Sequence, residues 1–127
     1  MRKPVTVALA LLALVLGLSA LAAADKTKEV AAAASWKGEI VDISCYAPRA
    51  AHGSGHADCA KKCLKSGQPM GLLTGDGDMV LLVADHDNGK PFEAAKDMAG
   101  TNVEVTGTMA EKGGLKVVTI TGIKPAA

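Results

Sequence analysis

Short apolar runs of strand length, each bounded by turn residues, are the feature that most restricts how this sequence can fold. Residues 70–74 and 79–84 are apolar and are joined by Gly-Asp-Gly-Asp, which is turn chemistry at every position. Residues 102–109 and 115–123 lie on either side of Glu-Lys-Gly-Gly. Along both segments, the residues that would form an inward face alternate with those of the opposite face. The two pairs predict two antiparallel hairpins.

One further strand and two short helices complete the predicted order. Residues 35–43 mix apolar and polar residues and predict a first strand, with a bend or bulge at Gly38. Residues 44–56 contain serine, proline and glycine, so we expect them to be irregular. Residues 57–67 predict a helix with aspartate in its first turn, lysine in its last and glycine just past its end. Residues 91–98 predict a second helix, which begins at a proline.

The predicted order is strand, cysteine insert with helix, hairpin, helix and hairpin, and five strands with a helix between the third and fourth is the order of the OB-fold. We therefore predict an all-β fold for residues 35–127, a five-stranded OB-fold-like Greek-key barrel with two short helices.

Several motifs strengthen this prediction by resemblance. The final hairpin, the first strand at 38–42 and the cysteine pattern resemble those of small exported bacterial domains of the OB type. The pattern consists of Asp42-x-x-Cys45, Cys59-x-x-x-Cys63 and Gly67-x-Pro69-x-Gly71-Leu72. The resemblance covers nearly the whole chain beyond residue 34, and it implies the fold but no particular activity.

The N-terminus has the three parts of a secretory signal peptide. Arg2 and Lys3 form a positive region, and residues 5–18 form an apolar region. Small residues follow, and Ala22 and Ala24 provide an A-x-A cleavage site.

We therefore predict a signal peptide over 1–24, a flexible tether over 25–34 and a periplasmic or secreted protein. The alternative is an uncleaved membrane anchor, because the apolar run is about long enough to span a bilayer.

The composition argues against nucleic acids as partners and suggests that the cysteines help to stabilise the domain. Removal of the two basic residues of the signal leaves 12 basic against 13 acidic residues, which lacks the basic footprint of a nucleic-acid-binding protein. Only Trp36, Tyr46 and Phe92 are aromatic, so the core is small and gains from a disulfide or a metal.

All three cysteines lie in one stretch with His52 and His56. One interpretation is a structural disulfide with one thiol left over, as is common in exported proteins. The other is a metal site, and the odd number of cysteines favours it, because a disulfide leaves one thiol unexplained.

Spacing separates these interpretations further. Residues four apart on a helix have Cβ atoms about 5–6 Å apart, whereas a disulfide needs roughly 3.5–4.5 Å. Cys59 and Cys63 therefore suit a shared metal ion better than a bond to each other, although either can reach Cys45. We predict that Cys45, His56, Cys59 and Cys63 bind a zinc or copper ion, with His52 as a reserve ligand and Met70 as a further soft ligand.

The predicted function is that of an exported metal-binding module for copper or zinc handling, whose partners are the metal ion or an unidentified exported protein. Nothing in the sequence marks a substrate cleft, so we predict no enzyme activity. The alternative is a disulfide-stabilised OB-type interaction domain that binds a protein or an oligosaccharide without metal.

We expect N-terminal sequencing of exported protein to begin at Asp25, because signal peptidase cuts after an A-x-A site. An intact residue 1 in the membrane fraction would show instead that the apolar run is an anchor.

Overall fold

The computed structural model of the protein describes residues 32–127. The predicted signal peptide, 1–24, and most of the predicted tether, 25–34, lie outside the described residues and stay predictions. Within residues 32–127, no helix has both the length and the apolar character needed to cross a membrane.

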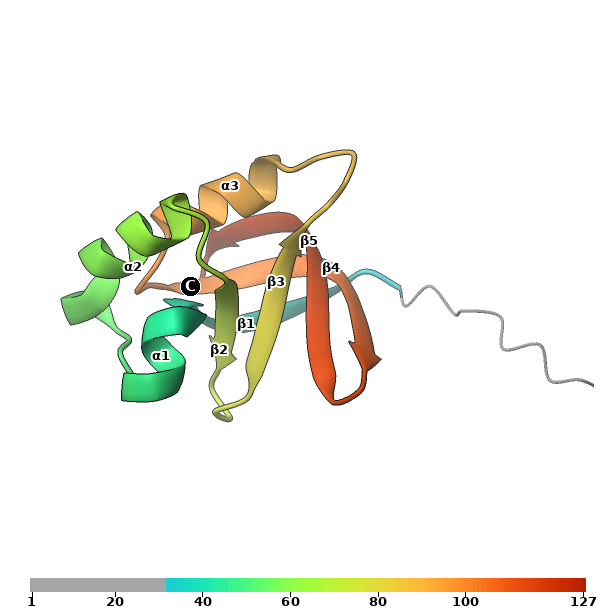
Figure 1. Cartoon of the computed structure of the whole chain (residues 1–127). Coiled ribbons are helices and arrows are strands. Elements are labelled where there is room, and N and C mark those ends of the chain that lie inside the picture. The colour runs from blue at the N-terminus through green and yellow to red at the C-terminus, as the bar shows by residue number, and fades with distance from the viewer. Residues whose placement is uncertain (1–31) are drawn as a thin grey trace, which may run out of the picture.

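Five strands form one mixed sheet (Figure 1). They are β1 (Ala34–Asp42), β2 (Met70–Thr74), β3 (Met79–Ala84), β4 (Asn102–Lys112) and β5 (Leu115–Pro125). The pairs β1–β2, β1–β4, β2–β3 and β4–β5 are antiparallel, whereas β3 and β5 are parallel. The order β1-β2-β3-β5-β4 closes into a ring, because β4 pairs with β1.

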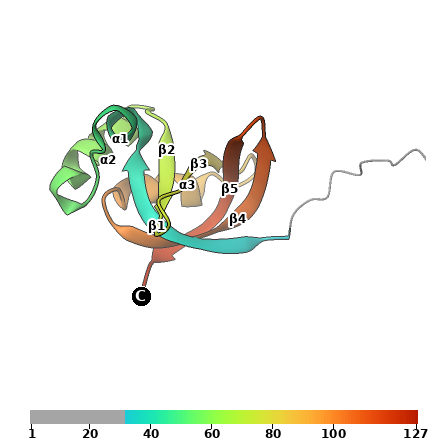
Figure 2. The same ribbon diagram turned by 90° about the horizontal axis from the view of Figure 1, so that it is seen from below.

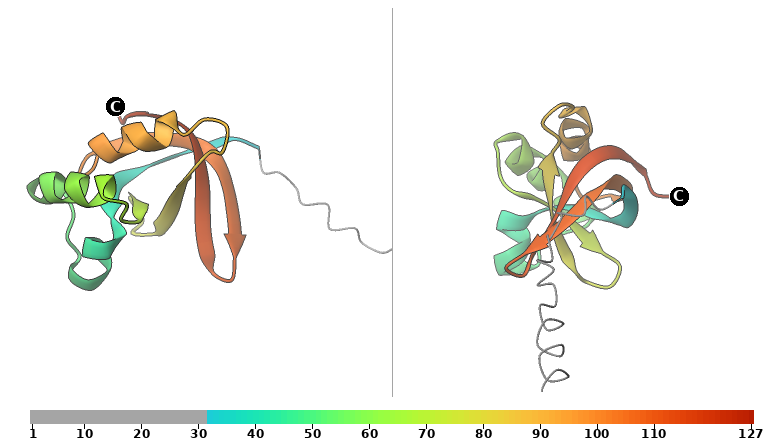
Figure 3. Two further views of the ribbon diagram at one scale, coloured as in Figure 1. Left: turned by 45° about the horizontal axis from the view of Figure 1, so that its top comes forward. Right: turned by 90° about the vertical axis from the view of Figure 1, so that its right-hand side faces the viewer.

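Three α-helices lie outside this ring of strands in the described part of the chain. They are α1 (Ile43–Arg49), α2 (Ala57–Lys65) and α3 (Lys90–Asp97), and a 3-10 turn, Ser54–His56, precedes α2. Figure 2 shows α1 and α2 together at one end of the strands, with the tip of the β4–β5 hairpin at the other. Helix α3 packs against β5 and also contacts α2 (Figure 3).

The hydrophobic core fills the space between the strands and the helices α2 and α3. Its members are aliphatic residues, alanines and one methionine, as the scarcity of aromatic residues requires. They are Ile40, Ala60, Leu64, Met70, Leu72, Val80, Leu82, Ala95, Ala99, Val103, Val105, Val118 and Ile120.

Gly38, where the sequence predicts a bend or bulge, lies where β1 changes partners. Gly38 lies opposite both Thr74 of β2 and Val103 of β4. A Cβ atom on Gly38 would collide with the carbonyl oxygen of Leu73. Only glycine therefore lets the two backbones approach this closely.

The predicted fold class is wrong. The protein is a mixed α/β domain and not the all-β, OB-fold-like Greek-key barrel with two short helices that the element order suggested. The parallel β3–β5 pair makes the sheet mixed, and α1 is a third helix. Alternation of apolar residues is the same in parallel and antiparallel strands, so it did not reveal that pair.

The expectation that residues 44–56 are irregular is also wrong in part, because α1 occupies the first half of that stretch. Pro48 falls in the last turn of α1 and does not prevent the helix from forming. The predicted positions of β2 and β3 match the structure, and those of α2 and α3 lie within two residues of it.

We expect Gly38→Ala to lower the free energy of unfolding by about 1–3 kcal/mol, because the added methyl group meets backbone that cannot move alone. Gly75→Ala in the β2–β3 turn is the matched control, since its Cβ atom would enter open space. Urea denaturation of both variants measures the difference. Equal midpoints for the two variants would contradict the close approach at Gly38.

Candidate metal centre

Helix α1 carries Cys45 and begins directly where β1 ends. Asp42, the last residue of β1, caps the helix: its Oδ1 atom accepts a hydrogen bond of 2.9 Å from the Ser44 backbone amide. The Ile43 amide donates to the Pro69 carbonyl oxygen at 3.0 Å, which ties the start of α1 to the segment before β2. Cys45 is consequently held in a fixed position, with only 7% of its surface exposed.

Helix α2 carries Cys59 and Cys63 on one face. Ala60 and Leu64, one position further along, are buried in the core and fix the rotation of the helix. Cys59 is then exposed and Cys63 half-buried. The helix ends as the sequence predicts, with Gly67 at a φ of 97° and its amide donating to the Leu64 carbonyl oxygen at 3.1 Å.

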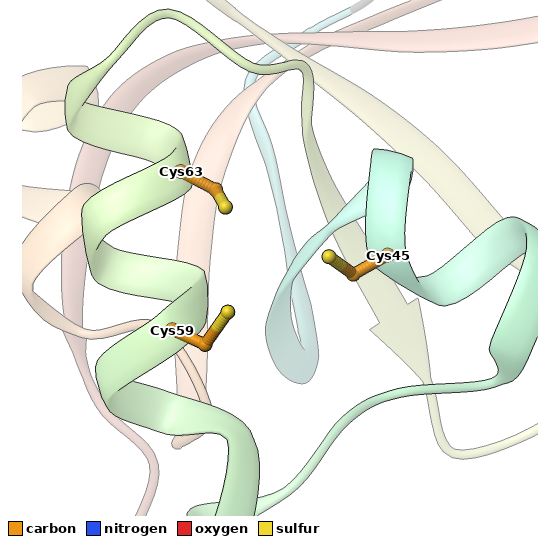
Figure 4. A group of neighbouring side chains, drawn as sticks. All are labelled: Cys45, Cys59 and Cys63. Atoms are coloured by element: carbon orange, nitrogen blue, oxygen red, sulfur yellow. The ribbon is translucent and has the colours of Figure 1, made fainter.

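The two helices bring the three cysteine side chains together. Figure 4 shows Cys59 and Cys63 pointing from α2 toward Cys45 on α1. The three sulfur atoms lie within 4.8 Å of one another, and all three thiols are free. Sulfur ligands about 2.3 Å from a tetrahedral ion are about 3.8 Å apart, so Cys45, Cys59 and Cys63 form a group that can hold a metal ion.

His56 joins this cluster beside Cys45. It ends the 3-10 turn that leads into α2, and its amide donates to the Gly53 carbonyl oxygen at 3.0 Å. Metal-ligating atoms of His56, Cys45 and Asp42 lie within 4.8 Å of one another. The cluster thus consists of two groups of donors that share Cys45.

Asp42 is a member of the cluster that the sequence analysis did not identify. It is fully buried, and its Oδ2 atom has no hydrogen-bond partner of normal geometry among the described residues. The available signal in the sequence was the Asp42-x-x-Cys45 spacing. An aspartate that caps a helix points one oxygen at the helix and leaves the other for a different partner.

The carboxylate of Asp42 and the burial of the cluster keep two thiols protonated. Burial and then the nearby Asp42 carboxylate raise the pKa of Cys63 to about 11, and the charges of the other two cysteines add to the effect. The interaction with Asp42 raises the pKa of Cys45, and burial raises it further.

Arg49 acts on Cys45 in the opposite direction. Its Nη2 atom lies 3.2 Å from the Cys45 sulfur and donates a hydrogen bond to it, which lowers the pKa of that thiol without cancelling the rise. Both thiols must lose a proton before they can bind a metal ion.

The structure places the reserve ligand His52 away from the cluster. Its Nδ1 atom lies 3.2 Å from a carboxylate oxygen of Glu39, and its side chain is 49% exposed. The other oxygen of Glu39 accepts a hydrogen bond from the Gly53 amide. His52 and Glu39 therefore hold the loop between α1 and the 3-10 turn against β1.

Met70, which the sequence suggested as a further soft ligand, is buried in the hydrophobic core. It lies opposite Asp42 in the β1–β2 pair, so the two side chains leave the sheet on the same face.

Comparison of the chain with protein-family models, with curated proteins and with solved structures gives no match. The resemblance to exported OB-type domains therefore stays a prediction, and any function must be argued from the cluster itself.

In the metal-free protein we expect the alkylation rate of Cys63 to be still rising at pH 10, because only the thiolate reacts and its pKa is about 11. Mass spectrometry of peptides after short exposure to iodoacetamide between pH 7 and 10 measures the rate. In urea the rate should be half-maximal near the ordinary thiol pKa of about 8.5 and level off above it. A plateau below pH 9 in the folded protein would contradict the influence of burial and Asp42.

Proposed function

We propose that this protein is an exported metal-binding module that handles copper or zinc and has no enzymatic activity. Its ligands are Cys45, Cys59 and Cys63, with His56 as the fourth. The observation that carries the proposal is the convergence of three free thiols from two helices to within 4.8 Å of one another.

The chemistry of the donors supports a soft or borderline ion. Thiolates favour copper(I) and zinc, and imidazole suits both elements. Arg49 supports the same conclusion, because its hydrogen bond to the Cys45 sulfur offsets part of the negative charge that the thiolates bring to the ion.

The exposure of the cluster supports handling of the ion rather than permanent storage. Cys45 is buried, but Cys59 is exposed on α2. An ion can thus enter and leave from the α2 side, and a partner protein can approach the exposed thiol. The partner is the metal ion alone or an unidentified exported protein, in the periplasm or outside the cell.

A disulfide remains the competing function for these cysteines. No pair is at bonding distance, yet sulfur atoms within 4.8 Å of one another can pair after small movements. In that case the protein would be a disulfide-stabilised interaction domain, and the third thiol would have no role.

Metal binding predicts that purified exported protein carries an ion and that at pH 10, where the metal-free thiols react, all three thiols resist alkylation until a chelator removes it. Native mass spectrometry before and after chelation, followed by alkylation, measures both. One thiol that reacts at once, with two more only after reduction, would support the disulfide instead.

Two variants test the ligands in the same assay. Cys63→Ser should abolish binding of copper(I), because it removes one of three thiolates. His56→Ala should weaken binding about tenfold or more, whereas the matched control His52→Ala should keep full affinity because its ring faces Glu39. If His56→Ala also keeps full affinity, the site consists of thiolates alone.

A further inference from the structure

Two polar atoms of the cluster are buried without a hydrogen-bond partner among residues 32–127. They are Oδ2 of Asp42 and Nε2 of His56. Their residues, Asp42 and His56, belong to one group of donors together with Cys45. A buried polar atom without a partner is costly, and most buried polar atoms in proteins are paired. Two such atoms on residues of one group indicate a ligand that supplies the missing interaction.

The geometry of this group suits one metal ion. Its three ligand atoms lie within 4.8 Å of one another. Bonds of about 2.0–2.3 Å to a tetrahedral ion place oxygen, nitrogen and sulfur ligands about 3.3–3.8 Å apart. Small rotations of the side chains therefore suffice for all three atoms to contact a single ion.

Asp42 is held in the orientation that such a ligand requires. Its Oδ1 atom accepts the Ser44 amide hydrogen bond, which restricts rotation of the carboxylate and leaves Oδ2 for another partner. The side-chain donors that interact with the Asp42 carboxylate are the thiols of Cys45 and Cys63, which are weak hydrogen-bond donors. A cation compensates a buried carboxylate far better than thiols do.

The nature of the donors distinguishes this group from the three cysteines. Oxygen, nitrogen and sulfur together suit a borderline divalent ion such as zinc. Copper(I) selects soft thiolate ligands and gains little from a carboxylate.

We propose that Asp42 is a metal ligand and that Asp42, Cys45 and His56 form a zinc site. This site adjoins the three-thiolate group that takes copper(I) and shares Cys45 with it. The inference rests on the proposed function of the cluster and deepens it, because it assigns a class of ion to each group of donors.

The test compares zinc and copper(I) affinities of the chain without its signal peptide, measured by competition with chromophoric chelators in the absence of oxygen. The first variant is Asp42→Asn, whose amide oxygen can still accept the Ser44 hydrogen bond. We expect its zinc affinity to fall about tenfold or more, as is typical when a residue supporting a metal site is replaced. Its copper(I) affinity should change less than about threefold, because the thiolates remain.

Matched variants distinguish a role of Asp42 as a metal ligand from its role as the helix cap and from a general effect of negative charge. Asp42→Ser keeps a residue that caps helices well but removes the carboxylate, so it should lose zinc affinity as Asp42→Asn does. Asp58→Asn removes an exposed carboxylate from the first turn of α2 and should keep both affinities. Circular dichroism confirms that each variant is folded.

The double variant Cys59→Ser/Cys63→Ser tests the other group. It should lose copper(I) affinity and still bind one cobalt(II) ion, used as a spectroscopic substitute for zinc, with an absorption band from a single thiolate. Unchanged zinc affinity in both Asp42 variants, or an equal loss in Asp58→Asn, would overturn the zinc site. If the unmodified protein binds neither ion, the proposed function fails instead.

Discussion

The cluster depends on the hydrogen bond between Asp42 and the Ser44 amide. No loop separates β1 from α1, so the same residue ends the strand and caps the helix. β1 pairs with two neighbouring strands and Asp42 is fully buried, so the start of α1 cannot shift without disturbing the sheet. Cys45 follows three residues later, and both groups of donors share it.

The other half of the cluster is fixed by separate contacts. Ala60 and Leu64 anchor α2 in the core. Gly100, at a φ of 75°, leaves no room for a side chain against Ala57, so the start of α2 packs directly on the segment before β4. Because α1 and α2 both pack against β1, the donors come together in the folded chain. Binding of an ion therefore adds its free energy to the stability of the fold.

The parts of the structure that the sequence predicted are those determined locally. Turn residues placed β2 and β3, and the spacing of four residues placed Cys59 and Cys63 on one face of a helix. Helix α1 was missed, because it has only seven residues, contains Pro48 and is tied at its start to the distant Pro69. The parallel β3–β5 pair was missed because apolar alternation carries no information on strand direction.

The candidate site shows the same difference between features determined locally and features determined by contacts distant in the sequence. The sequence placed three cysteines and two histidines in one stretch, but their spacing could not tell which histidine faces the cysteines. Glu39 determines which histidine it is. It binds His52 and the Gly53 amide, and His56 lies near Cys45. Asp42 was missed as a candidate ligand because its burial results from the packing of the sheet and two helices, which no local pattern records.

Charge explains how this cluster can exist without an ion. Three thiolates and a carboxylate as close together as the donors of this cluster would repel one another strongly in a partly buried site. Asp42 and burial raise the pKa values of Cys45 and Cys63, so these two thiols stay protonated near pH 7. Arg49 lies against the Cys45 sulfur, where its positive charge favours the thiolate once an ion displaces the proton. Metal binding then replaces the thiol protons by a cation, and until it does so the protonated thiols let the folded protein hold the donors ready for the ion.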